Sequence, residues 1–275
     1  MRNEAQRLVI LNATLTRRDY SPRDDHIKER IPGSIWFDFK AFSHPHLKLS
    51  YMMPPDHYFI QRMKEINVRK SDLVVVYDKY KMISAPRAFW MLKTFGIQDA
   101  YLLNGTFSKW QREGRPIESG DQESAFVKQH KTLSKFDDFS YKQDTKKIRK
   151  YQEIEAIVSE NKKKQNDSEM NPLLDSRVRK YYERGHIPTS RSLSLTDVLD
   201  DDFCYKKSEE MKKIIKEIGG IQNPEKDEVI MTCQRGITAC IVDAAFRTVG
   251  NNNTSVYDGS YEEYAKINGI KTDRD

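Results

Sequence analysis

The sequence of 275 residues contains only three cysteines, Cys204, Cys233 and Cys240, and no CxxC pair. This odd, irregularly spaced set gives neither a disulfide framework nor a zinc-ligand pattern, and it is typical of a reducing compartment. Long hydrophobic runs are also absent. No stretch approaches the roughly 20 apolar residues that a membrane-crossing helix needs, and the first eight residues lack the apolar core of a secretory signal. We therefore expect no metal site, no cofactor, no membrane span and no export by that route.

Charge and composition narrow the function classes further. Hydrophobic residues make up 37% and charged residues 32% of the chain, which suits folded domains with large solvated surfaces. The net charge of +6 would favour anionic partners, but much of the excess lies in one lysine-rich region and not on a basic patch interleaved with aromatic residues. Nucleic-acid binding is therefore not expected.

The second half of the sequence repeats the first. Leu103–Trp110 and Tyr257–Tyr264 each contain a glycine followed by aromatic residues two and five positions later, and the two glycines are 154 residues apart. Phe95-Gly96 and Val249-Gly250 keep the same offset. Self-similarity that keeps its register indicates a duplicated domain. We place an N-terminal domain at residues 1–118, a polar linker at residues 119–147 and a C-terminal domain at residues 148–275.

Each half alternates short apolar runs with amphipathic segments, which predicts an α/β fold. Strands are expected near residues 8–12, 73–77, 100–103, 172–174, 229–232 and 255–257. Helices are expected where apolar residues recur at spacings of three and four, as in Phe89, Leu92 and Phe95. Such alternation predicts a parallel sheet in each domain with helices on both faces.

Cys233 is the main candidate for a reactive residue. It follows the β-branched run Val229–Thr232, begins a short loop that contains Gly236, and precedes an apolar helix. At such a turn the loop N–H groups and the positive end of the helix face the sulfur and favour the thiolate. Arg235 adds a fixed positive charge. A lone cysteine after a buried strand also fits a small core residue, so both interpretations stay open.

From Leu8 to about Ile267 the chain resembles the tandem-domain rhodanese family, which comprises thiosulfate and mercaptopyruvate sulfurtransferases. In the second half the resemblance is carried by Leu174-Asp175-Ser176-Arg177, Gly185-His186-Ile187-Pro188, the Cys233 loop and Tyr257-Asp258-Gly259-Ser260. In the first half it is carried by Arg30-Ile31-Pro32-Gly33, Val75-Val76-Tyr77-Asp78 and residues 85–92. Asp78 replaces the catalytic cysteine there, so the first of the two rhodanese-like domains is expected to be non-catalytic.

The resemblance implies that Cys233 takes a sulfur atom from a small anionic donor, holds it as a persulfide, and passes it to a thiol or to cyanide. The expected substrate-binding residues are Gln234, Arg235, Gly236, Ile237 and Thr238 in the loop, with Arg179 and Lys180 outside it. Arg179 and Lys180 are candidates because Tyr181 stands where the family has a donor-binding arginine. A basic residue after the cysteine favours thiosulfate over mercaptopyruvate. Ala239 stands where the related phosphatases need an arginine, which disfavours phosphatase chemistry.

Two alternatives remain open at this stage. Mercaptopyruvate could be the donor, or the chain could be a catalytically weak structural or adaptor subunit of a larger, mitochondrial protein complex. Family resemblance favours the mitochondrial matrix, with the cytoplasm as the alternative location.

Overall fold

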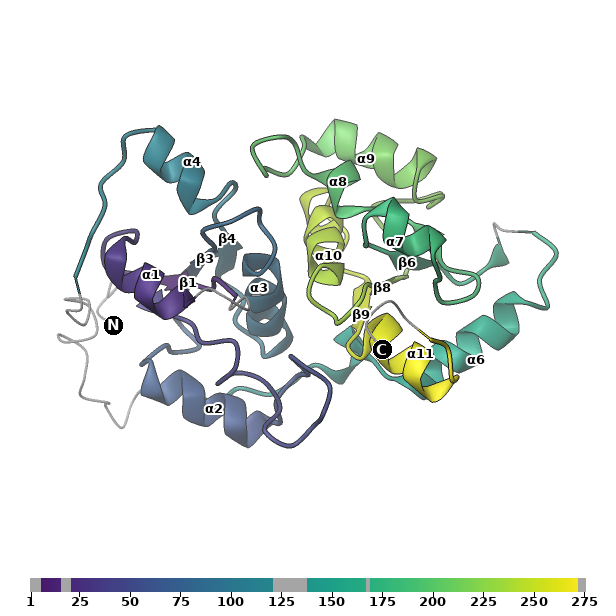
Figure 1. Cartoon of the computed structure of the whole chain (residues 1–275), viewed down its shortest axis with the longest axis horizontal. Helices are drawn as coiled ribbons and strands as arrows, with labels where there is room; N and C mark the ends of the chain where they lie inside the picture. The colour runs from purple at the N-terminus through teal and green to yellow at the C-terminus, as the bar shows by residue number, and fades with distance from the viewer. Residues whose placement is uncertain (1–5, 16–20, 121–137, 167–168, 272–275) are drawn as a thin grey trace, which may run out of the picture. The chain divides into compact units, whose positions relative to one another are not determined.

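A computed structural model describes residues 6–15, 21–120, 138–166 and 169–271 (Figure 1). The chain divides into two compact units, one of Met1–Pro45 with Met53–Asp144 and the other of His46–Met52 with Thr145–Asp275. Residues 121–137 of the expected linker lie outside the described residues. In the described part of the chain, no helix combines the length and the apolar character needed to cross a bilayer.

The first unit contains a four-stranded parallel sheet in the order β2-β1-β3-β4. Its strands are β1 (Leu8–Asn12), β2 (Ile35–Trp36), β3 (Leu73–Tyr77) and β4 (Ala100–Leu102), and its helices are α1 (Pro22–Lys28), α2 (Asp56–Glu65), α3 (Ala85–Thr94) and α4 (Phe107–Arg112). The β3 sequence LVVVY is rich in β-branched residues, which favour an extended backbone. It therefore lies inside the sheet, paired with β1 and β4.

The second unit contains a five-stranded parallel sheet in the order β5-β9-β8-β6-β7. Its strands are β5 (Ile148–Arg149), β6 (Leu173–Asp175), β7 (Arg191–Ser192), β8 (Val229–Thr232) and β9 (Thr254–Tyr257). Its helices are the 3₁₀ helix η1 (Thr145–Lys147), α6 (Tyr151–Asn161), α7 (Arg179–Glu183), α8 (Leu195–Val198), α9 (Ser208–Glu217), α10 (Ala239–Thr248) and α11 (Ser260–Ile267). All four residues of β8 are buried, so the central strand carries no solvent-facing side.

Apolar helices enclose these sheets. The first eight residues of α10 are all buried, and all of them except Asp243 are apolar. In the second unit α6 lies beside α11 (Figure 1). The rings of Tyr151 and Tyr264 are 5.9 Å apart between these helices. In the first unit Phe59 of α2 stacks on Phe95 after α3, with ring centroids 3.7 Å apart.

The duplication is visible in matching backbone geometry. The N–H of Phe107 donates to the carbonyl of Asp78, and the N–H of Tyr261 donates to the carbonyl of Cys233, both at 3.0 Å. Gly96 and Gly250 follow α3 and α10 with φ angles of 90° and 88°, a left-handed conformation that glycine adopts without strain. The predicted α/β class with two parallel sheets flanked by helices is confirmed.

The elements that the sequence pattern missed are short. Strands β2, β5 and β7 have two residues each, and helices α1, α4, α7, α8 and α11 have between four and eight. Segments of this length hold too few residues for a period to show.

Candidate active site

The loop that follows β8 has the geometry expected from its sequence. Cys233 is the first residue after the strand, and Thr238 is the N-cap of α10. The Cys233 side chain is buried, with 1% of its surface exposed. Gly236 has φ +74°, a conformation that a residue with a side chain adopts only at a cost, so glycine is needed at this bend.

Several backbone donors in this loop are unfilled. Within the described part of the chain, the N–H groups of Gln234, Arg235, Ile237 and Thr238 have no intramolecular acceptor. These N–H groups lie beside the positive end of the ten-residue helix α10. The arrangement suits an anion, including a negatively charged sulfur at Cys233.

The start of α11 holds the first two loop residues in place. The Oγ atom of Ser260 accepts a hydrogen bond from the Cys233 N–H at 3.2 Å, donates to the Tyr257 carbonyl at 2.8 Å and lies 3.9 Å from the Cys233 sulfur. Ser260 adopts φ +51°, a strained conformation for a non-glycine residue. The N–H of Glu262 donates to the Gln234 carbonyl at 3.1 Å. The start of α11 therefore holds the backbone of Cys233 and Gln234 in position.

Arg177 reaches the loop from the end of β6. Its guanidinium pairs with the fully buried carboxylate of Asp175, with Nη2 and Oδ2 2.7 Å apart, and it donates to the Gly185 carbonyl at 2.7 Å. It stacks over the Tyr261 ring, 4.3 Å from the centroid. Its Nη1 also donates to Oε1 of Gln234 at 3.3 Å, so this buried ion pair orients a side chain of the loop.

Arg235 has a carboxylate partner of its own. Its Nε lies 2.9 Å from Oε2 of Glu262, and about one third of each side chain is exposed. The positive charge expected beside the sulfur is therefore present in the loop, but a fixed negative charge accompanies it.

Arg179 and Lys180 lie on the exposed short helix α7. Among the described residues, neither side chain makes a hydrogen bond or ion pair with the Cys233 loop. Arg177 is buried, whereas Val178 and the residues of α7 that follow it lie at the surface. A role for Arg179 and Lys180 in donor binding stays a prediction.

The remaining residues around the loop have structural partners. Ile237 is buried, and the Ser176 hydroxyl donates to the Thr238 hydroxyl at 3.1 Å. The Cys240 thiol is fully buried and lies 3.4 Å from the Gly236 carbonyl that accepts its hydrogen bond. His186 stacks on the ring of Tyr182 at 3.9 Å, and its Nδ1 lies 3.0 Å from the carbonyl of the same residue.

The equivalent loop of the first unit is filled by its own carboxylate. The buried side chain of Asp78 accepts hydrogen bonds from the N–H groups of Tyr80, Ser84 and Ala85 at 3.1, 2.9 and 2.9 Å. Burial raises the pKa of this carboxyl to about 6, against the effect of those amides. Asp78 stands at the position of Cys233, and the N–H groups of its loop bind its carboxyl group.

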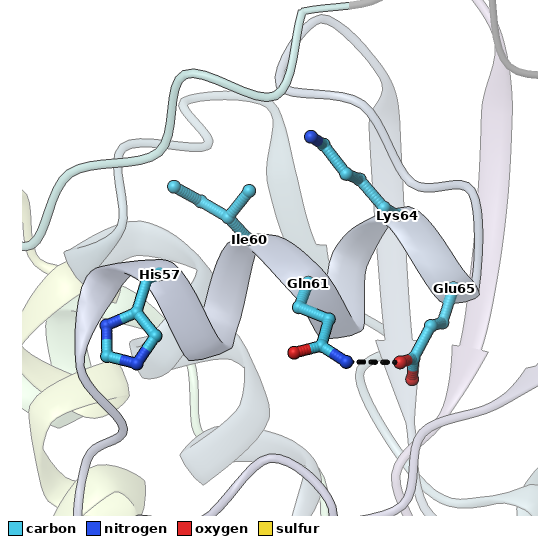
Figure 2. Close-up of a pocket in the computed structure, with 5 residues that line it drawn as sticks. All are labelled: His57, Ile60, Gln61, Lys64 and Glu65. Atoms are coloured by element: carbon cyan, nitrogen blue, oxygen red, sulfur yellow. Dashed lines mark hydrogen bonds between the residues drawn. The ribbon is translucent and has the colours of Figure 1, made fainter.

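A separate pocket of about 470 Å³ lies in the first unit. Figure 2 shows that one face of α2 lines it, through His57, Ile60, Gln61, Lys64 and Glu65. The Gln61 side chain donates to Glu65 Oε1 at 3.1 Å (Figure 2). None of the residues predicted for the site lines this pocket.

Sequence reasoning missed two residues at the site, Ser260 and Glu262. Gly259-Ser260 was part of the repeated segment, but only the fold shows that its helix begins against the Cys233 loop. The contact of Arg177 with Gln234 likewise joins residues 57 positions apart.

Comparisons with known proteins find the same domain twice in this chain. The family described as the rhodanese-like domain matches residues 12–113 and 158–267. A probable 3-mercaptopyruvate sulfurtransferase of Schizosaccharomyces pombe is 27% identical over 97% of this chain and 89% of its own length. The thiosulfate sulfurtransferase of Gallus gallus is 28% identical over 94% of this chain and 86% of its own length.

A solved structure shows the same fold over nearly the whole chain. The crystal structure of the Tum1 protein from Saccharomyces cerevisiae aligns with a TM-score of 0.80 and 25% identity, covering 97% of this chain and 91% of that one. The chain belongs to the rhodanese family and has two rhodanese-like domains in tandem. The two relatives described above are named as a probable sulfurtransferase and as a sulfurtransferase.

Proposed function

We propose that the protein is a sulfurtransferase in which Cys233 carries the transferred sulfur as a persulfide. The observation that supports this proposal most strongly is that, among the residues that the structure describes, the N–H groups of Gln234, Arg235, Ile237 and Thr238 have no acceptor in the loop between Cys233 and α10. In the first unit, the same type of loop holds the carboxylate of Asp78. Together these two loops favour anion binding in both units, with a reactive sulfur in only one.

The reaction has two displacement steps. In the first, the Cys233 thiolate attacks the outer sulfur of thiosulfate, a new S–S bond forms, and sulfite leaves with the electron pair of the old S–S bond. In the second, cyanide or a thiolate attacks the outer sulfur of the persulfide, and the Cys233 thiolate leaves. The loop amides offset the negative charge on the sulfur atoms in both steps.

Thiosulfate is the proposed donor because Arg235 is a basic residue directly inside the loop. Arg235 and the exposed residues Arg179 and Lys180 provide positive charge for a small anion. Mercaptopyruvate is the alternative donor, and it is supported by the name of the Schizosaccharomyces pombe relative. Both donors leave the same persulfide on Cys233, so the first step can be compared between them directly.

The acceptor, the location and any complex belong to the same proposal. A small thiol or cyanide is the proposed acceptor, and the mitochondrial matrix is the proposed location, with the cytoplasm as its alternative. A second candidate function is that of an adaptor subunit in a larger assembly. It is favoured by the burial of Cys233, because a sulfur that is 1% exposed can react with a donor only after a local opening of the structure.

Steady-state kinetics test the proposal. We expect thiosulfate-dependent formation of thiocyanate from cyanide, with parallel double-reciprocal lines as the second substrate is varied. Cys233→Ser should abolish turnover, whereas Cys204→Ser, at a buried cysteine remote in sequence from the loop, should retain it. Absence of turnover with thiosulfate and with mercaptopyruvate, in a folded protein that purifies with a stoichiometric partner, would favour the adaptor function.

A further inference from the structure

Arg177, which contacts the Cys233 loop, and Arg235, which lies in it, are each paired with a carboxylate. Arg177 pairs with the buried Asp175 at 2.7 Å, and Arg235 pairs with Glu262 at 2.9 Å. The charges of these four side chains sum to zero. An incoming anion therefore meets the loop amides and the end of α10 without an uncompensated cation from either arginine.

The two pairs differ in how strongly they are held. Asp175 is fully buried and accepts three hydrogen bonds from the Arg177 guanidinium and one from the Arg177 N–H, so this pair is part of the folded core. The Arg235–Glu262 pair is about one third exposed on both sides. Its carboxylate can be removed without leaving a buried charge unpaired.

Glu262 is nevertheless fixed in position beside the loop. Its N–H donates to the Gln234 carbonyl, and the preceding N–H, from Tyr261, donates to the Cys233 carbonyl. The Glu262 backbone is therefore held against the loop, and its carboxylate is paired with the loop residue Arg235. A fixed negative charge at this place repels every anionic donor, and it repels a dianion about twice as strongly as a monoanion.

We propose that Glu262 is a specificity-determining residue that sets the preference of the site between sulfur donors of different charge. By neutralising Arg235, it lowers the advantage of the dianion thiosulfate relative to the monoanion mercaptopyruvate. The inference rests on the proposed function of Cys233. It adds that the donor preference is set by the residue that pairs with the basic loop residue, in addition to the loop sequence itself.

The test measures the ratio of kcat/KM for thiosulfate to kcat/KM for mercaptopyruvate in the full-length protein. Glu262→Gln keeps the side-chain shape and the backbone N–H, and removes the charge. Glu228→Gln is the matched control, because Glu228 forms an exposed ion pair with Arg149 at the opposite end of β8. Persulfide formation on the wild-type protein is measured by mass spectrometry in the same experiment.

In Glu262→Gln we expect kcat/KM to rise about tenfold for thiosulfate and about threefold for mercaptopyruvate, since the gain in free energy scales with donor charge. The rise in the ratio should shrink as the ionic strength increases. Glu228→Gln should leave the ratio unchanged. In Glu262→Gln, an unchanged ratio of the two kcat/KM values, or a fall in kcat/KM for both donors, would overturn the inference. Failure of the wild-type protein to form a persulfide would instead overturn the proposed function.

Discussion

Asp78 and Cys233 occupy equivalent positions in the two units, and their carbonyl groups accept the same hydrogen bond, from Phe107 and Tyr261, at 3.0 Å. Each residue directly follows the strand that lies between β1 and β4 or between β6 and β9. Their side chains differ in what they do for the loop. The Asp78 carboxyl group accepts hydrogen bonds from amides of its own loop, whereas among the described residues the N–H groups of Gln234, Arg235, Ile237 and Thr238 have no intramolecular acceptor.

Two buried groups in the first unit should give opposite dependences of stability on pH. Burial raises the pKa of Asp78 to about 6, and burial, with Arg30 and Lys79 nearby, lowers the pKa of His26 to about 4. The contribution of Asp78 is present below its unfolded pKa near 3.8 and is lost as the pH rises towards 6. The contribution of His26 is present above its unfolded pKa near 6.5 and is lost as the pH falls towards 4.

Single substitutions should expose these opposing contributions. Relative to the wild type, Asp78→Asn should become more stable as the pH rises from about 4 to 6, and His26→Asn should become less stable over that range, each by up to about 3 kcal/mol. All three tryptophans, Trp36, Trp90 and Trp110, lie in the first unit, so urea unfolding followed by tryptophan fluorescence reports on it selectively. Parallel stability curves for the wild type and both variants would contradict this assignment.

Ser260 should contribute to the rate of persulfide formation. In Ser260→Ala the N–H of Cys233 loses its acceptor in a buried place, at a cost of about 1–3 kcal/mol. We expect persulfide formation to slow about tenfold or more. Ser260→Gly is the matched variant, because glycine also lacks the hydroxyl but relieves the strain of φ +51°. If both variants react at the wild-type rate, the hydroxyl has no role in positioning the loop.

The ion pair between Arg177 and Asp175 should be essential for the stability of the second unit. Arg177→Met would leave the fully buried Asp175 carboxylate without its partner, and we expect a loss of about 3–5 kcal/mol in the free energy of unfolding. Asp175→Asn in the same chain should recover part of that loss. Chemical unfolding followed by circular dichroism measures both. A single variant as stable as the wild type would show that the charge is compensated by other groups.

Much of the fold follows from the sequence, because the central strands are β-branched and the domain occurs twice. The predicted strand near residues 73–77 matches β3, and the one near residues 229–232 matches β8. The edge strands β2, β5 and β7 could not be predicted, because two residues carry no alternation. Their extended conformation depends on neighbours in the sheet, which act only after the chain has folded.

The candidate site, like the fold, could be predicted from the sequence only in part. The Cys233 loop could be recognised because its strand, thiol, glycine and helix are consecutive in the sequence. The pairing of Arg235 with Glu262 could not, since it depends on where α11 begins relative to the loop. Arg179 and Lys180 lie two to three residues after the buried Arg177, and nothing in their sequence indicates that α7 exposes them.

The most direct test of the account is the mass of the intact protein after incubation with thiosulfate and removal of excess donor. We predict a gain of one sulfur atom per chain, located on Cys233 by peptide mapping, absent in Cys233→Ser and reversed by cyanide. Cys204 and Cys240, which are also buried, should stay unmodified. A folded protein that gains no sulfur from either donor, or gains it at another cysteine, would contradict the assignment of Cys233 as the sulfur carrier.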